Sequence, residues 1–229
     1  MEIVAADVGV NGPHGPLLEP TSLRARSGEL LLVTGPPRSG RTALALVLSG
    51  RLRPDRGTVL RNGRRNPARL RETVSVIDAP GITEPEGALE LTEIVGEGLS
   101  LAGRRCGRKA VRRWITGRGL DEWAHTRFEQ LPPRIRTRVL LDLGRAPRGT
   151  EALVLDCPDR HGDDPLNWYP AAREAAEHGY AVVVVCSPHS ADDLNAPTVR
   201  IGTSSTIDDP PSRTDALRTP DQETPGTTS

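Results

Sequence analysis

The chain has 229 residues, 36% of them hydrophobic, and its 30 lysines and arginines balance 30 aspartates and glutamates. This length and apolar content suffice for one domain with a full core, whereas a net charge of zero excludes a global attraction to nucleic acid or anionic membrane. No apolar run approaches the ~18 residues of a membrane-spanning helix.

The N-terminal residues, the cysteines and the basic residues indicate where the protein is located and what kind of genome encodes it. The first ten residues carry neither a basic patch nor a long apolar stretch, so we expect no signal peptide. The cysteines, at positions 106, 157 and 186, lack metal-ligand spacing and fit a reducing cytosol better than a disulfide scaffold. Lys109 is the only lysine, and this arginine bias is typical of a GC-rich, actinobacterial-like genome.

Short apolar runs alternate with helical patterns along much of the chain. The runs predict buried strands at residues 29–35, 72–78, 151–157 and 180–187. Good helix formers predict helices at residues 42–50 and 171–179. Strand–loop–helix units of this kind predict an α/β fold with a mostly parallel sheet and helices on its faces.

Two segments differ from this alternation. Residues 84–146 lack strong β runs, and their apolar residues recur at helical spacing near Ile135 and Val139, so we predict an inserted helical subdomain. Residues 203–229 are rich in Thr, Ser and Pro and cannot bury enough surface to offset their ordering entropy, which predicts a disordered tail. One domain over residues 1–202 remains.

The run at 29–35 ends in the loop GPPRSGRT, which has the spacing of the phosphate-binding motif G-x-x-x-x-G-K-[ST] with Arg41 in place of lysine. The loop follows a strand and opens a helix, as that motif requires, so its backbone N–H groups could bind an anion at the helix N-terminus. The alternative is a tight glycine turn. The candidate nucleotide-binding residues are Gly35, Pro36, Pro37, Arg38, Ser39, Gly40, Arg41 and Thr42.

The residues around this loop carry a more specific pattern. Residues 18–63 resemble the N-terminal half of an ABC-type ATPase, which continues after the phosphate loop with "L-x-P-x-x-G-x-V", here Leu52 to Val59. The resemblance extends to about residue 202, and within it LVLDCPD, at residues 153–159, resembles the Walker B strand. It implies a P-loop NTPase fold with an ABC-type core, ATP and Mg²⁺ as cofactors, and Thr42 and Asp156 as metal ligands.

Several catalytic positions depart from the family. Cys157 stands at the position of the catalytic glutamate, and the expected glutamine is absent near Asp78. Ser187 replaces the switch histidine, although His189 follows two residues later. Arg38 stands where the family often places glycine, so we expect strain there.

The family signature L-S-G-G-Q is lost as well. EQLPPRIRTRVLL occupies residues 129–141, so Pro132 and Pro133 replace its serine and first glycine. Proline has no N–H to offer a phosphate, although it begins a helix well. Together these changes predict a poor or inactive ATPase that can still bind nucleotide.

The resemblance also implies partners. Such a subunit is cytoplasmic, peripheral to the inner face of the cell membrane, and pairs with a separately encoded permease and with another cassette as a homo- or heterodimer. The basic run 104–118 lies in the lobe that faces the membrane subunit in this family, and it lacks the interleaved aromatics of a nucleic-acid site. Two alternatives stay open: an active ATPase with Arg41 on phosphate and a shifted histidine, and a soluble interaction protein unrelated to transport. The sequence names no substrate, because the permease selects it.

Overall fold

The computed structural model describes residues 1–162, 164–192, 194 and 196–204. The predicted disordered tail therefore lies, from residue 205 onward, outside the described residues. No helix in the described part is both long and apolar enough to cross a membrane.

A parallel five-stranded sheet, in the order β5-β6-β7-β3-β8, forms the centre of the molecule. Its strands are β3 (Leu30–Thr34), β5 (Val74–Ile77), β6 (Ala152–Asp156), β7 (Ala181–Cys186) and β8 (Thr198–Arg200). Every residue of β3, β6 and β7 is buried, as their continuous apolar runs predict. The predicted α/β fold with a mostly parallel sheet is confirmed.

A second, antiparallel sheet in the order β2-β1-β4 packs beside the first, and the sequence interpretation had assigned no strands to it. Its strands are β1 (Glu2–Gly12), β2 (Gly15–Arg26) and β4 (Arg56–Arg61). β1 and β2 form a long hairpin that closes at Gly12 and Gly15. Register shifts interrupt β1 after Ala5, and Asp7 there has a φ of 52°, so the sequence lacks a clean two-residue alternation.

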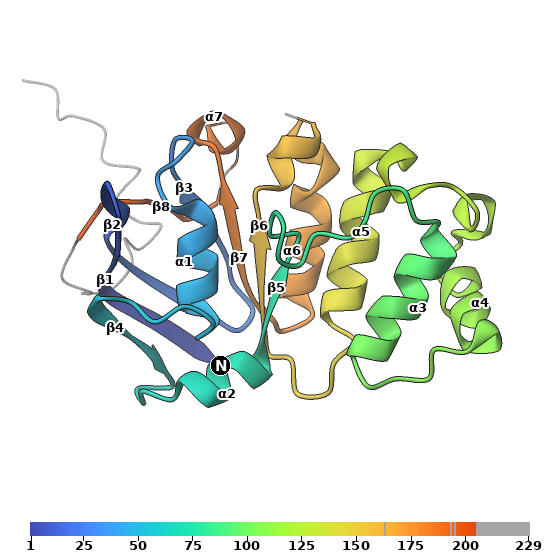
Figure 1. Cartoon of the computed structure of the whole chain (residues 1–229), viewed down its shortest axis with the longest axis horizontal. Coiled ribbons are helices and arrows are strands. Elements are labelled where there is room, and N and C mark those ends of the chain that lie inside the picture. The colour runs from blue at the N-terminus through green and yellow to red at the C-terminus, as the bar shows by residue number, and fades with distance from the viewer. Residues whose placement is uncertain (163, 193, 195, 205–229) are drawn as a thin grey trace, which may run out of the picture.

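Helices cover both faces of the parallel sheet (Figure 1). α1 (Arg41–Leu48) packs between that sheet and the antiparallel one, and shares a core with Ile3 and Val33. α6 (Tyr169–Glu177) lies on the opposite face, in a separate core with Trp168. There are two further short helices. α2 (Pro67–Thr73) precedes β5, and α7 (Pro188–Ala191) follows β7.

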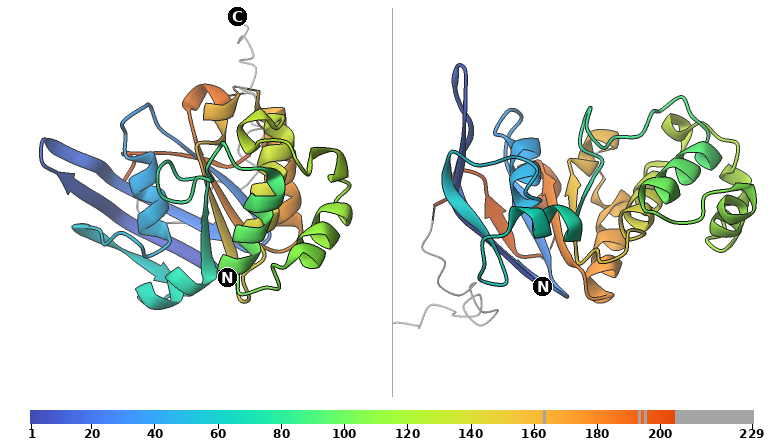
Figure 2. Two further views of the ribbon diagram at one scale, coloured as in Figure 1. Left: turned by 45° about the vertical axis from the view of Figure 1, so that its right-hand side comes forward. Right: turned by 60° about the horizontal axis from the view of Figure 1, so that its bottom comes forward.

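The segment between β5 and β6 is helical. It contains α3 (Leu91–Leu101), α4 (Arg108–Thr116) and α5 (Pro133–Gly144) with short 3₁₀ turns between them. α5 packs on α6 and β5, while α3 and α4 lie farthest from the antiparallel sheet (Figures 1 and 2). The buried side chains of α5, including Val139 and Leu140, follow the helical spacing seen in the sequence.

Candidate functional site

The backbone of the loop between β3 and α1 is tightly constrained. Gly40 has a φ of 88°, and a Cβ there would lie 2.2 Å from the carbonyl oxygen of Leu17, so only glycine fits. Arg38 has a φ of 68°, the left-handed conformation that its place in the motif led us to expect. The hydroxyl of Ser39 folds back toward Gly35 and is buried without a hydrogen-bond partner.

Arg41 begins α1, but its cation is not free. Its Nη1 lies 4.0 Å from Oδ2 of Asp159. The same oxygen accepts hydrogen bonds from the N–H of Ser187 (2.8 Å) and the hydroxyl of Ser190 (3.1 Å). Asp159 is 8% exposed, and its Oδ1 has no hydrogen-bond partner. Sequence reasoning missed this residue, although it lies only two positions beyond Cys157.

The end of β6 places Asp156 and Cys157 beside the loop helix. Asp156 is fully buried, and its Oδ2 lacks a hydrogen-bond partner. The thiol of Cys157 donates to the other oxygen of Asp156 at 3.0 Å. Burial, and then the negative charge of Asp156, raise the pKa of this thiol far above its ordinary value. The thiol therefore stays protonated, and it cannot accept a proton from water as a glutamate would.

These residues fit magnesium and nucleotide in part. An orphaned, buried carboxylate oxygen on Asp156 is a hard ligand of the kind that Mg²⁺ prefers. The Thr42 side chain is half-buried in the first turn of α1. The donors at the N-terminus of α1 suit a phosphate, but the pairing of Arg41 with Asp159 reduces the positive charge that such a group would meet.

The two candidates for the switch position have other surroundings. Ser187 caps α7, because its hydroxyl accepts from the N–H of Ser190 at 3.2 Å. His189 is exposed, and its ring forms no hydrogen bond or ion pair within the described part of the chain. The structure thus brings Ser187 to Asp159 and leaves His189 at the surface.

The prolines in place of the signature begin α5. Pro132 is its N-cap residue and Pro133 its first residue, with no side-chain cap. The helix N-terminus therefore lacks the N–H groups that these two positions would supply.

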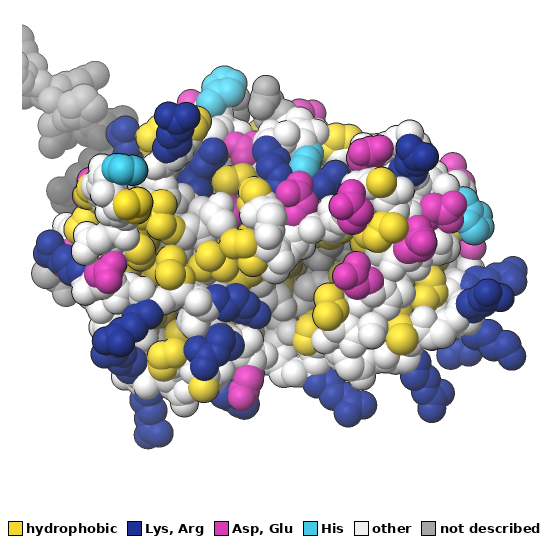
Figure 3. Space-filling view, viewed as in Figure 1, with side chains coloured by type: hydrophobic (Ala, Val, Ile, Leu, Met, Phe, Trp, Pro, Cys, Tyr) yellow, Lys and Arg dark blue, Asp and Glu magenta, His cyan; other side chains and the backbone are white. Residues whose placement is uncertain are grey.

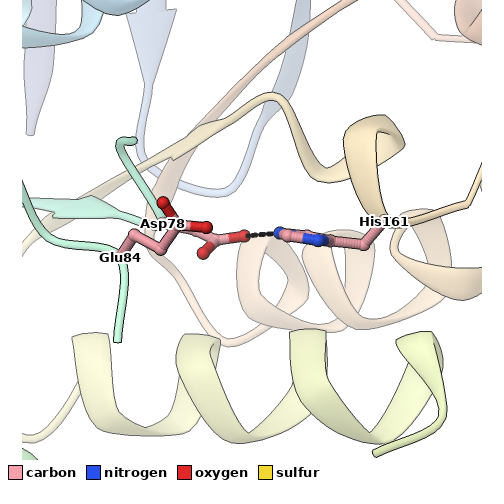
Figure 4. Close-up of side chains that lie close together, drawn as sticks. All are labelled: Asp78, Glu84 and His161. Atoms are coloured by element: carbon pink, nitrogen blue, oxygen red, sulfur yellow. Dashed lines mark hydrogen bonds and ion pairs between the residues drawn. The ribbon is translucent and has the colours of Figure 1, made fainter. Parts of the chain in front are cut away.

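A charged cluster occupies the place where the family's glutamine is expected (Figure 4). Asp78 follows β5 with a φ of 63° and is 2% exposed. Its carboxylate contacts Nη2 of Arg160 at 2.8 Å and Nε2 of His161 at 3.0 Å. Arg160 also lies 3.0 Å from Glu84 and donates to the backbone carbonyls of Asp78 and Asp156.

Asp78, Glu84 and His161 are close enough to share a metal ion, with ligand atoms within 4.8 Å of one another. Arg160 already neutralises both carboxylates, and a second arginine, Arg136, lies within 4 Å of each. A divalent cation would have to displace or oppose both guanidinium groups. The cluster is therefore an ion-pair network rather than a metal centre.

No family model matches the sequence. The hemin import ATP-binding protein HmuV of Gloeobacter violaceus is 32% identical over 197 residues, which cover 79% of this chain and 71% of that protein. This chain belongs to the ABC-transporter ATP-binding subunits. A nucleotide-free ATP-binding cassette from an ABC transporter has a TM-score of 0.66 at 16% identity, over 88% of both chains. A putative ABC transporter ATP-binding protein from Pyrococcus furiosus has a TM-score of 0.64 at 17% identity, over 90% of this chain and all of that one.

Within this ATP-binding subunit, Arg136 joins the charged cluster to α5. It is 8% exposed, lies 3.8 Å from Asp78, and stacks over the ring of Phe128 at 4.8 Å. Arg138, two residues later on the same helix, is exposed instead. The cluster thus ties the ends of β5 and β6 to the first turn of α5.

A groove of about 920 Å³ lies between the segment after β5 and the helices α3 and α5. Five carboxylates line it, from Asp78, Glu84, Glu86, Glu97 and Glu129. Two exposed apolar side chains, Ile82 (53%) and Leu101 (82%), also border it. Figure 3 shows acidic and apolar side chains gathered together on this part of the surface.

Proposed function

We propose that this ATP-binding subunit binds ATP weakly, hydrolyses it slowly or not at all, and acts in its transporter mainly by docking to a separate membrane permease. The observation that carries the proposal is the neutral, buried thiol of Cys157 at the position of the catalytic glutamate. A thiol that already donates to Asp156 offers no basic atom to an attacking water.

In this proposal, residues 35–42 hold ATP. The N–H groups of residues 40–42 bind phosphate oxygens, whereas that of Ser39 donates to the carbonyl of Pro36 at 3.2 Å. Thr42 and Asp156 bind Mg²⁺. The bound metal neutralises phosphate charge. Binding is weak because the Asp159 carboxylate competes with phosphate for Arg41, 4.0 Å away. Pro132 and Pro133 also remove donors that a facing cassette would need.

ATP turnover by the purified full chain tests the proposal. We expect the Mg²⁺-dependent rate to equal that of Asp156→Ala, which removes the proposed metal ligand. A rate near ~1 s⁻¹, which is ordinary for enzymes, that disappears in Asp156→Ala would overturn it.

One observation favours the alternative of an active ATPase with divergent motifs. Asp159 is a buried carboxylate near Arg41 with an oxygen that lacks a partner, so it is a candidate base in place of the missing glutamate. In that case Asp159→Asn abolishes a measurable wild-type turnover. Under the main proposal there is no turnover to lose.

We further propose that residues 84–146 form the helical subdomain of a single nucleotide-binding domain, 1–202, and carry its docking surface. Three groove carboxylates, from Glu86, Glu97 and Glu129, form no ion pair within the described residues. With the exposed Ile82 and Leu101 beside them, they fit a basic, apolar segment of a permease. The subunit would then sit at the cytoplasmic face of the membrane, paired with a second cassette of the same or another chain. The hemin in the name of the Gloeobacter violaceus relative is not assigned to this chain, because the permease selects the substrate in this family.

A further inference from the structure

A second cavity, of about 550 Å³, lies at the C-terminal end of α1, between α2 and β4. The phosphate loop is at the other end of the same helix, and eight helical residues span roughly 12 Å. The cavity is therefore separate from the proposed nucleotide site. Its size falls within the roughly 300–1,000 Å³ of small-molecule pockets.

Four arginines line this cavity: Arg51, Arg53, Arg65 and Arg71. No aspartate or glutamate lines it, and none of the four forms an ion pair within the described part of the chain. Other arginines of the same elements do find partners, since Arg56 pairs with Asp7, Arg61 with Glu151 and Arg69 with Glu72. Four arginines thus line one cavity without a counter-charge among its lining residues, and Figure 3 shows basic side chains gathered over α2 and β4.

Backbone groups hold two of these arginines in place. Arg51 donates to the carbonyl of Val74 at 2.9 Å, and Arg71 donates to the carbonyl of Gly50 at 3.0 Å. Burial, and then the neighbouring charge of Arg71, lower the pKa of Arg51. Like charges held together without a counter-charge repel one another, and a bound anion relieves that repulsion.

The floor of the cavity is apolar. It includes Val47, Val59 and Leu70, whose side chains are nearly fully buried in the protein. Thr58 also lines the cavity, and its hydroxyl oxygen is buried without a hydrogen-bond partner. Charged donors over an apolar floor suit a ligand with two chemically different ends.

We propose that this cavity binds an amphiphilic anion, with a phosphate or carboxylate head among the arginines and an apolar body on the floor. Arginine suits such a head because its planar donor fork matches phosphate and carboxylate oxygens. The ligand would lie beside the acidic groove, since Arg51 lines both cavities. The proposal does not depend on ATP binding or hydrolysis.

Calorimetric titration of the full chain with hexyl phosphate tests the proposal. The double variant Arg53→Gln/Arg65→Gln removes two cavity charges from exposed side chains that make no described hydrogen bond. The control Arg64→Gln/Arg105→Gln removes the same charge from exposed arginines outside the cavity. We expect the cavity variant to bind at least about tenfold more weakly than wild type, and the control to bind as wild type does.

Titration with inorganic phosphate and with hexanol tests separately the contributions of the anionic head and of the apolar body. Inorganic phosphate should bind at least several-fold more weakly than hexyl phosphate, and hexanol should not bind measurably. Equal affinity of phosphate and hexyl phosphate, equal weakening in both double variants, or no binding of hexyl phosphate at millimolar concentration would each overturn the proposal.

Vesicles distinguish a lipid headgroup from a soluble anion. The full chain is sedimented with vesicles of phosphatidylcholine containing phosphatidic acid, using the same two double variants. Binding that is lost in the cavity variant and kept in the control supports the site with a membrane lipid as its ligand. Binding of hexyl phosphate without binding of vesicles supports the site with a soluble anion.

Discussion

The guanidinium of Arg41 lies 4.0 Å from Asp159, a carboxylate that is itself held by Ser187 and Ser190. Both side chains are mostly buried, so this ion pair is less screened than a surface pair. The start of α1 thus carries the positive charge of Arg41, but the Asp159 carboxylate already attracts that charge. A phosphate must therefore compete for it.

Replacing Asp159 with asparagine should strengthen ATP binding by about five- to tenfold, roughly 1 to 1.4 kcal/mol. Asparagine keeps an oxygen for the Ser187 N–H while it removes the charge that competes for Arg41. Titration calorimetry with ATP measures the gain. When Asp159→Asn is made in a protein that already carries Arg41→Gln, the gain in ATP affinity should largely vanish. A gain of the same size in that protein would show that Arg41 plays no part.

The cysteines give a second prediction at this scale. Cys106 is exposed, whereas Cys157 and Cys186 are buried and all three are free. Burial, and then the charge of Asp159, raise the pKa of Cys186 to about 12, and burial raises that of Cys157 as well. We expect a thiol reagent at pH 8 to label one cysteine in the native protein and three after denaturation. Rapid labelling of two or more native thiols would contradict this.

The same shifts set a direction for the pH dependence of stability. In the unfolded chain these thiols ionise above about pH 8.5, while in the folded chain they stay protonated. The folded state then binds more protons, so the free energy of unfolding should fall as pH rises above 8.5, by up to about 1.4 kcal/mol per pH unit and thiol. Cys157→Ala/Cys186→Ala should flatten that decline in urea denaturation, and an unchanged slope would reject it.

At the scale of elements, the cluster around Asp78 joins three parts of the chain through charge. Asp78 follows β5, Arg160 follows β6, and Arg136 belongs to α5. Glu84 shares the cluster: burial would raise the pKa of its carboxylate, but Arg160 lowers it below its ordinary value. The network therefore holds the helical segment against the sheet.

Arg136 and Arg138 provide a matched test on one helix. Arg136→Met keeps the stem of a buried side chain but removes a charge beside Asp78 and the stacking on Phe128, so we expect a loss of about 2 kcal/mol. Arg138 is exposed, and Arg138→Met should change stability by no more than about 0.5 kcal/mol. Urea denaturation measures both changes. If the two variants have equal midpoints and slopes, the network contributes nothing to the free energy of unfolding.

The elements differ in how far the sequence could predict them. Buried parallel strands such as β7 are continuous apolar runs, and their ends were predicted to within two residues. The hairpin of β1 and β2 was missed, because bulges break its alternation. Within the site, motif spacing led to Arg41, and the resemblance to the family led to Asp156 and Cys157. Neither could find the charged cluster, since Asp78 and Arg160 meet only through the neighbouring ends of β5 and β6.

Over the whole molecule, a net charge of zero conceals separate charged regions. Acidic side chains line the groove between β5 and α3, while most basic residues of the run 104–118 are exposed on and before α4. Figure 3 shows the two regions on one face, with basic side chains at the end of the molecule that holds α4. A permease could thus meet both an acidic groove and a basic edge.

The basic edge is the part of this surface that can be altered with least harm to the fold. Arg104 donates to the carbonyl of Ala146 and Arg118 pairs with Asp142, so both are left unchanged. Arg105, Arg112 and Arg113 are exposed and form no ion pair within the described part of the chain. Changing exposed charges usually costs within about half a kcal/mol each.

If docking uses this edge, Arg112→Glu/Arg113→Glu should detach the subunit from membranes that contain its permease, and raised salt should do the same because it screens exposed charges. The control Arg64→Glu/Arg200→Glu reverses two exposed arginines that lie outside the helical segment and should sediment as wild type does. Co-sedimentation with and without the permease gives the readout. If the edge variant sediments like wild type, the run is only a solvated helix face. If wild type sediments equally well without the permease while the edge variant does not, the basic edge binds lipid directly, and the groove alone remains as a docking surface for the permease.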